Sequence, residues 1–168
     1  MKQIKNERGF TLIELLAVIV VLAIVLLMGA MAVIPRMNDA RKQVFALEAN
    51  TAIQGASTFL MNNALKGSGA KVFPTSPDKP ECVSIQELIT DGIVDFDSSY
   101  KGYIIVQKKA SNSNVYLYRI TMTNGSIVVF EKGVDSGENV DITSDMVVDL
   151  TTQTVPDACP SPVPSITG

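Results

Sequence analysis

The sequence contains no histidine among its 168 residues. Histidine is the usual general base near neutral pH and the commonest zinc ligand, so its absence removes most catalytic and zinc-binding sites from consideration. The phosphate-binding loop, the dinucleotide fingerprint and the G-x-S-x-G pattern of hydrolases are missing as well. The sequence therefore predicts a protein that is not an enzyme and needs no cofactor and no metal.

Basic residues are scarce in the second part of the chain. From Gly67 onward there are seven basic and thirteen acidic residues, a net charge of minus 6, and no basic residue follows Lys132. Such an acidic surface disfavours a broad phosphate-binding face, so we predict no nucleic-acid binding for this part. Asp135, Asn139 and Asp141 alternate in a manner that suits calcium, but the loop lacks the closing glutamate of an EF-hand. A solvated acidic loop is the favoured interpretation.

Charge is absent from a long apolar run near the N-terminus. From Leu15 to Ile34 twenty residues carry no charged and no strongly polar side chain. As a helix the run is about 30 Å long, the hydrocarbon thickness of a bilayer. Lys2, Lys5 and Arg8 precede it, which favours a cytoplasmic N-terminus and export of the rest of the chain. No convincing A-x-A site follows, so an uncleaved single-pass anchor is favoured over a secretory signal peptide.

Cysteine is limited to Cys82 and Cys159, which have no metal-type spacing. Behind such an anchor they lie outside the cytoplasm, where an oxidising environment favours a disulfide; a pair of buried free thiols is the alternative. The bridge closes a loop of 77 residues, which stabilises the fold by about 4 to 5 kcal/mol if it acts through the entropy of the unfolded chain.

The helical pattern continues beyond Pro35, which is expected to kink the helix without ending it. Residues 36–66 are rich in helix formers, and Gly67 supplies the stop. Apolar positions recur at helical spacing and predict a stripe that packs on a sheet. The stripe consists of Met37, Ala40, Val44, Leu47 and Thr51, followed by Ala52, Ala56, Phe59 and Leu60.

Beyond Gly67 the patterns predict a small β-rich head. Ser84 and Glu87 form a capping-box pattern at the start of a short helix, which ends near Gly92. Strands are predicted at about 103–108, 115–123 and 126–132, with a weaker one at 145–150. The proline-punctuated tail is expected to be extended, tied back by the disulfide and frayed beyond Cys159.

Asn124-Gly125 predicts a hairpin with a type I′ turn, because that turn needs positive φ at both central residues. Alternate residues of the preceding strand share one face, and we expect them to form core against the helix rather than a binding surface. These residues are Tyr116, Tyr118, Ile120 and Met122.

The N-terminus itself reads Arg8-Gly9, then Phe10-Thr11-Leu12-Ile13-Glu14, then the apolar run. This arrangement resembles the type III signal of type IV pilins and pseudopilins, which are filament subunits processed by a prepilin peptidase. The resemblance covers about residues 5–35. It implies cleavage after Gly9, N-methylation of Phe10, and an assembly role for Glu14, whose carboxylate meets the Phe10 amine of an adjoining subunit. A contact with Phe10 of the same helix is the alternative.

Residue patterns and resemblance agree on an α+β fold, with a long N-terminal helix and an antiparallel head packed on its second half. The expected regions are a leader at 1–9, a transmembrane or filament-core half at 10–35, an amphipathic half at 36–66, and the head with its tail at 67–168.

The expected function is that of a structural subunit of a type IV pilus or related filament. The precursor is anchored in the cytoplasmic membrane with its head outside, and the mature chain polymerises through its helix into an extracellular filament. The implied partners are copies of itself, other pilins, the prepilin peptidase and the pilus assembly platform. One alternative is a minor pilin or pseudopilin of a secretion or DNA-uptake system. Another, from a different class, is a monomeric membrane-anchored binding protein.

Overall fold

A computed structural model describes residues 11–67, 71–151 and 154–166, with the backbone alone at 31–35. The chain divides into two compact units, one up to Ala40 and one from Arg41 onward. Helix α1, Leu12–Lys66, has 55 residues and belongs partly to each unit. It is helical through Pro35 and is followed by Gly67, the predicted stop. The described helix begins at Leu12. Phe10, the first residue of the predicted filament-core half, lies outside the described residues.

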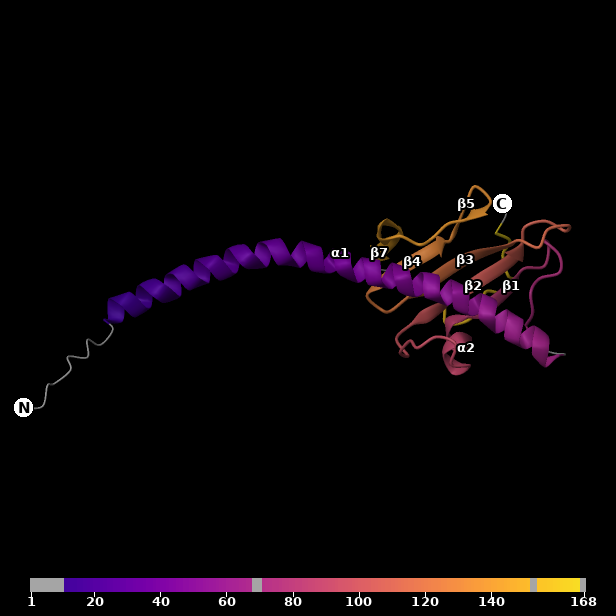
Figure 1. The fold of residues 1–168 in the computed structure, drawn as a ribbon, viewed down its shortest axis with the longest axis horizontal. Helices are drawn as coiled ribbons and strands as arrows, with labels where there is room; N and C mark the ends of the chain where they lie inside the picture. The colour runs from indigo at the N-terminus through magenta and orange to yellow at the C-terminus, as the bar shows by residue number, and fades with distance from the viewer. Residues whose placement is uncertain (1–10, 68–70, 152–153, 167–168) are drawn as a thin grey trace, which may run out of the picture. The chain divides into compact units, whose positions relative to one another are not determined.

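The second unit contains a five-stranded antiparallel sheet with the order β1-β2-β3-β4-β7 (Figure 1). Its strands are β1 (Glu81–Ser84), β2 (Lys101–Lys108), β3 (Tyr116–Thr123), β4 (Ile127–Lys132) and β7 (Val147–Asp149). A short hairpin, β5 (Val134–Asp135) and β6 (Glu138–Asn139), forms a second sheet; helix α2 (Ile85–Thr90) and a 3-10 turn (Ser144–Met146) complete the head. The predicted α+β architecture is confirmed.

The three long strands were predictable, whereas β1 and the β5–β6 hairpin were not. Strand β1 has only four residues and follows a proline-rich loop, so it shows no periodic signal of its own. It becomes a strand because it pairs with β2, with Cys82 opposite Ile105. In the region 145–150, only Val147–Asp149 are a strand, after the 3-10 turn.

The hairpin between β3 and β4 is present, but the predicted type I′ turn is wrong. Gly125 has a φ of +87°, whereas Asn124 does not have the positive φ that this turn requires. Instead, the Asn124 Oδ1 atom accepts hydrogen bonds from the backbone amides of Ser126 at 3.1 Å and Ile127 at 3.2 Å. The asparagine therefore shapes the turn through its side chain rather than through its backbone.

The main core lies between α1 and the sheet. From α1 it includes Phe45 and Leu60, and from the sheet it includes Ile120 and Met122, with the partly buried Tyr116 and Tyr118 packed against them. The face of β3 predicted to pack against the helix therefore does so.

The first five residues of the predicted helix stripe do not pack on the sheet, so this part of the prediction is wrong. Ala52, Ala56, Phe59 and Leu60 are buried, but Met37, Ala40, Val44, Leu47 and Thr51 are exposed. Phe45, Ala46 and Ala49 pack against the sheet in their place. This helix has apolar residues on both sides, so helical spacing alone could not select the side that meets the sheet.

The opposite face of the sheet is covered by the C-terminal tail. Ile166 is buried in a second cluster with Cys82, Tyr103, Ile105 and Leu117. Arg119 Nη2 donates a hydrogen bond to the Ile166 carbonyl at 2.6 Å. Gln107, only 1% exposed, accepts a bond from the Ile166 amide and donates one to the Pro77 carbonyl. The expected fraying beyond Cys159 is therefore wrong for the described residues up to 166.

Candidate functional site

The predicted cleavage and methylation residues, Gly9 and Phe10, lie outside the described residues. The description begins at Thr11, one residue before α1, and Glu14 lies in the first turn of the helix. The geometry of the candidate site is therefore that of the start of α1.

Thr11 and Glu14 cap this helix reciprocally. The Glu14 Oε2 atom accepts hydrogen bonds from the Thr11 backbone amide and from the Thr11 hydroxyl, each at 2.9 Å. In return, the Glu14 amide donates to Thr11 Oγ1 at 3.4 Å. This is the capping-box arrangement, in which two unpaired donors of a helix start are satisfied. The role of Thr11 was missed at the level of sequence, although the T-x-x-E spacing is the signal that reveals it.

The helix beyond this cap has the length and composition of a membrane span. Leu12–Ala30 form a candidate span of 19 residues with mean hydropathy 3.0, and none of it is buried. At the standard rise it is about 28 Å long. Glu14 is its one charged residue. An exposed surface of this kind is unfavourable in water and needs lipid or protein to cover it.

Residues 4–30 match the family described as the prokaryotic N-terminal methylation motif. The chain carries the type IV prepilin signal. The matched range includes Gly9, Phe10 and Glu14, and the signal together with the apolar helix indicates membrane anchoring. Comparison with curated proteins gives no match, and neither does comparison with solved structures. The prepilin signal thus characterises the N-terminal segment, and the head must be understood from its own structure.

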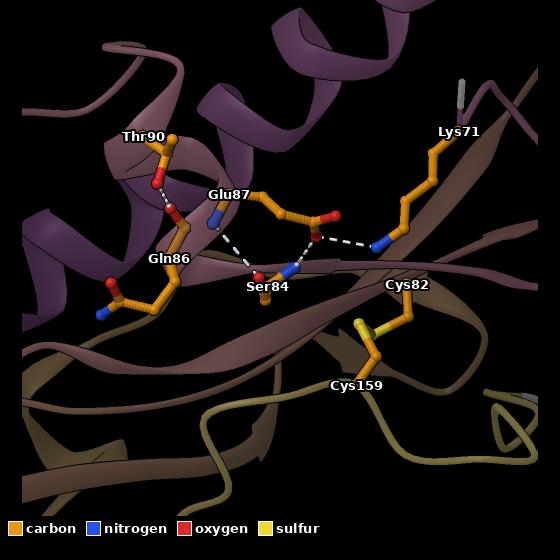
Figure 2. A network of polar contacts seen from close by, with 7 residues as sticks. All are labelled: Lys71, Cys82, Ser84, Gln86, Glu87, Thr90 and Cys159. Atoms are coloured by element: carbon orange, nitrogen blue, oxygen red, sulfur yellow. Dashed lines mark hydrogen bonds and ion pairs between the residues drawn. A yellow bond between two sulfur atoms is a disulfide. The ribbon is translucent and has the colours of Figure 1, made fainter. Parts of the chain in front are cut away.

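The head, which follows the helix in the chain, is cross-linked by a disulfide between Cys82 and Cys159, the predicted pairing. Figure 2 shows it next to a polar network at the junction of β1 and α2. There Glu87 Oε2 accepts bonds from the Ser84 amide at 2.8 Å and from Lys71 Nζ at 2.7 Å, and Ser84 Oγ accepts one from the Glu87 amide. The predicted capping box is therefore confirmed, with Lys71 as an additional partner.

The protonation of Glu87 reflects this network. Partial burial by itself raises the pKa of this carboxyl, but the bonds from Lys71 and Ser84 outweigh it and lower the pKa below its ordinary value. Glu87 is therefore ionised at neutral pH and holds the segment that begins at Lys71 against the start of α2.

A second set of polar contacts joins the loop before β2 to α1. The Tyr100 hydroxyl donates to Glu48 Oε2 at 2.7 Å, and the ring stacks on Phe96 and Phe45, with ring centroids 4.8 and 6.3 Å away. Burial and the Glu48 carboxylate raise the pKa of Tyr100 to about 12. These contacts position the helix on the head.

The acidic loop considered for calcium is fastened to β3 by the side chain of Asn139. Asn139 Oδ1 accepts a bond from the Tyr118 amide at 3.0 Å, and its Nδ2 donates to the Tyr116 carbonyl at 2.8 Å. Asn139 thereby continues the ladder at the edge of β3. Within residues 11–67, 71–151 and 154–166, no group of three or more His, Cys, Asp or Glu side chains is arranged to hold a metal ion.

Proposed function

We propose that this chain is a prepilin that is cleaved after Gly9, N-methylated on Phe10 and polymerised through α1 into a filament. The observation that carries the proposal is the prepilin signal at residues 4–30, which runs directly into an exposed apolar helix. Hydrolysis of the Gly9–Phe10 bond by water leaves a carboxylate on Gly9 and a free amine on Phe10. A methyl-donor co-substrate then transfers its methyl group to this amine, which loses one proton, and the demethylated donor leaves.

Before cleavage the chain is a single-pass protein of the cytoplasmic membrane. Residues 1–9 stay on the cytoplasmic side as the leader, residues 10–35 cross the bilayer, and the head is outside. The charge distribution supports this direction, because Lys2, Lys5 and Arg8 precede the apolar run. The disulfide supports it too, since disulfides persist in oxidising compartments.

After cleavage the apolar half of α1 leaves the lipid and is covered by other copies. Residues 36–66 hold the head, residues 67–168, through the core described above. Glu14 needs an opposite charge in such surroundings, and the Phe10 amine of an adjoining subunit supplies one. The chain acts as the substrate of a prepilin peptidase and as a building unit moved by an assembly platform, and none of these steps requires a catalytic group of its own.

The direct test is the mass of the mature chain and of its N-terminal peptide. We expect a start at Phe10 whose mass exceeds that of the unmodified residue by one methyl group. Gly9→Val should block cleavage and leave the leader attached. A mature chain that still begins at Met1 would contradict the proposal and support a monomeric membrane-anchored binding protein.

The abundance of this chain in sheared filaments then distinguishes a major subunit from a minor pilin or pseudopilin. A major subunit should dominate the sheared material, whereas a minor subunit should be rare beside another pilin.

A further inference from the structure

The turn between β3 and β4 contains the one Asn-Gly pair of the sequence, Asn124-Gly125. An asparagine followed by glycine is chemically labile, because glycine has no Cβ to shield its backbone nitrogen from the asparagine side chain. Asn124 is half-buried and Gly125 is exposed, so water reaches this turn. The pair therefore combines a reactive dipeptide with a hydrated position.

The reaction open to this pair is deamidation. The Gly125 nitrogen attacks the Asn124 Cγ atom and forms a new C–N bond, while Nδ2 leaves with the Gly125 amide proton as ammonia. Water then opens the resulting succinimide ring at either of its two carbonyls, which gives aspartate or isoaspartate at position 124. Water is the only co-reactant, so the conformation of the turn controls the rate at a given pH and temperature.

The folded turn holds the attacking nitrogen in a hydrogen bond. The Gly125 amide donates to Thr123 Oγ1 at 3.0 Å, and the Thr123 hydroxyl donates in turn to the Ile127 carbonyl at 2.7 Å. Thr123 is only 3% exposed, so this hydroxyl is fixed inside the head. The nitrogen must lose its proton to attack, and a proton bonded to a buried oxygen is harder to remove.

The folded turn also holds the group that is attacked. The Asn124 Oδ1 atom accepts two backbone amides of the turn. Its Nδ2 group donates to the Tyr100 hydroxyl, which gives its own proton to Glu48. Both ends of the side-chain amide are therefore engaged, and Cγ cannot turn toward the Gly125 nitrogen without breaking these bonds.

We propose that Asn124 is a latent deamidation site, which the folded β3–β4 hairpin keeps closed and which reacts when the hairpin opens. The products do not fit the closed turn. Isoaspartate adds a main-chain atom between two paired strands, whose register depends on the length of the turn. Aspartate lacks the donor to Tyr100 and adds a second carboxylate to the one from Glu48. A chain that stays open is thus modified irreversibly and loses the turn that closed it.

Peptide mapping by mass spectrometry tests the protection. The full chain is incubated in detergent and mildly alkaline buffer, folded in one sample and denatured by guanidinium chloride in the other. We expect the peptide with Asn124 to deamidate about tenfold or more faster in the denatured sample, because the folded turn must first open. Equal rates in the two samples would overturn the proposal.

Thr123→Val tests the bond to the attacking nitrogen, since it keeps the shape of the side chain and removes the hydroxyl. Near-ultraviolet circular dichroism checks that the variant is folded. Under folding conditions its deamidation should be about fivefold faster than in the wild type, the factor that corresponds to one typical hydrogen bond. Thr123→Ser keeps the hydroxyl and should react like the wild type. An unchanged rate in folded Thr123→Val would overturn the proposal.

Tyr100→Phe makes the same test at the other end of the reacting pair, and it decides the question if Thr123→Val does not fold. The substitution removes the acceptor of the Asn124 Nδ2 group and lies outside the hairpin. Deamidation should again be about fivefold faster in the folded variant. A rate equal to that of the wild type would overturn the proposal.

Asn112-Ser113 is an internal reference in every peptide map. Asn112 is exposed in the loop between β2 and β3, and a small residue follows it. Its ratio of denatured to folded rates should be smaller than that of Asn124. Equal ratios would assign the protection to the fold as a whole rather than to this turn, and would overturn the proposal.

Refolding tests the consequence of the modification. A sample held denatured until part of the chains are deamidated at Asn124 is returned to folding conditions and treated briefly with a protease. We expect the digested fraction to be enriched in modified chains and the resistant fraction in unmodified ones. Equal content of the modification in the two fractions would overturn the claim that deamidation prevents closure.

Discussion

The side chain of Asn50 forms a paired hydrogen bond with the backbone of Ile142, 92 residues further along the chain. Asn50 Nδ2 donates to the Ile142 carbonyl, and the Ile142 amide donates to Asn50 Oδ1, both at 2.9 Å. This pair fastens the segment before β7 to α1 and adds to the Lys42–Asp149 ion pair between α1 and β7.

Replacing Asn50 by leucine should destabilise the head by about 2 to 3 kcal/mol, because both backbone groups of Ile142 lose their partner in a partly buried position. Chemical unfolding of the full chain in detergent, followed by near-ultraviolet circular dichroism, measures this. Gln54→Leu, one turn further on α1 and exposed, is the control and should change stability little. Equal stability of the two variants would show that the Asn50 pair contributes nothing.

Thr11→Ala should loosen the start of α1 by about 1 kcal/mol, since it removes the side chain that caps the helix. Amide hydrogen exchange of the full chain in micelles should then be about fivefold faster at Glu14 and Leu15. Thr11→Ser keeps the hydroxyl and should exchange like the wild type. Unchanged exchange in Thr11→Ala would mean that the bond from the backbone amide of residue 11 to the Glu14 carboxylate caps the helix without the threonine side chain.

The double substitution Cys82→Ser and Cys159→Ser should lower the free energy of unfolding by about 4 to 5 kcal/mol, because the unfolded chain regains the freedom of a long loop. Reduction of the wild-type chain should lower the free energy of unfolding by the same amount. A loss below about 1 kcal/mol would show that the tail is held mainly by its other contacts.

Tyr100 makes stability depend on alkaline pH. Its folded pKa of about 12 lies above the ordinary value of 10.0, so the folded state prefers the protonated phenol. The stability from this preference is present below pH 10 and is lost as the pH rises toward 12. Burial also raises the pKa of Tyr118, so absorbance titration should show more than one late-ionising tyrosine. Tyr100→Phe should remove the Tyr100 component, whose pKa is about 12. In the Tyr100 component, Glu48→Gln should lower the midpoint, because the neighbouring carboxylate charge is gone; an unchanged midpoint would assign the whole shift to burial.

Gln107→Ala should release the C-terminal tail from the sheet. The variant leaves the Pro77 carbonyl and the Ile166 amide without this partner and should cost about 2 to 3 kcal/mol. Limited proteolysis after Cys159 should become faster than in Lys109→Ala, a control at an exposed neighbouring position. Cleavage at the same rate in both variants would contradict this role.

The N-terminal region was predictable because its signals are local. The prepilin motif is a contiguous string, and the apolar run needs only its length and lack of charge to be recognised. The long strands of the head were found in the same way, from alternation within one segment. The position of Glu14 was clear from the sequence, and its cap with Thr11 follows from a spacing of three residues.

Features that depend on distant partners were not predictable. Strand β1 exists because β2 supplies its hydrogen bonds, and the tail is held on the sheet because Gln107 and Arg119 bind the backbone of Ile166. The turn at Asn124 shows the same limit at short range. A dipeptide preference indicated the hairpin, but the side-chain bonds to Ser126 and Ile127 decided its type.

The sequence by itself determined that this chain begins with a prepilin signal, enters an apolar helix and ends in a small β-rich head with one pair of cysteines. Only the tertiary structure decided which side of α1 meets the sheet. Apolar residues lie on both sides of that helix, so burying Phe45 and Ala49 left Val44 and Leu47 exposed. Helical spacing cannot rank two such faces, whereas packing against one particular sheet selects the side whose shape fits.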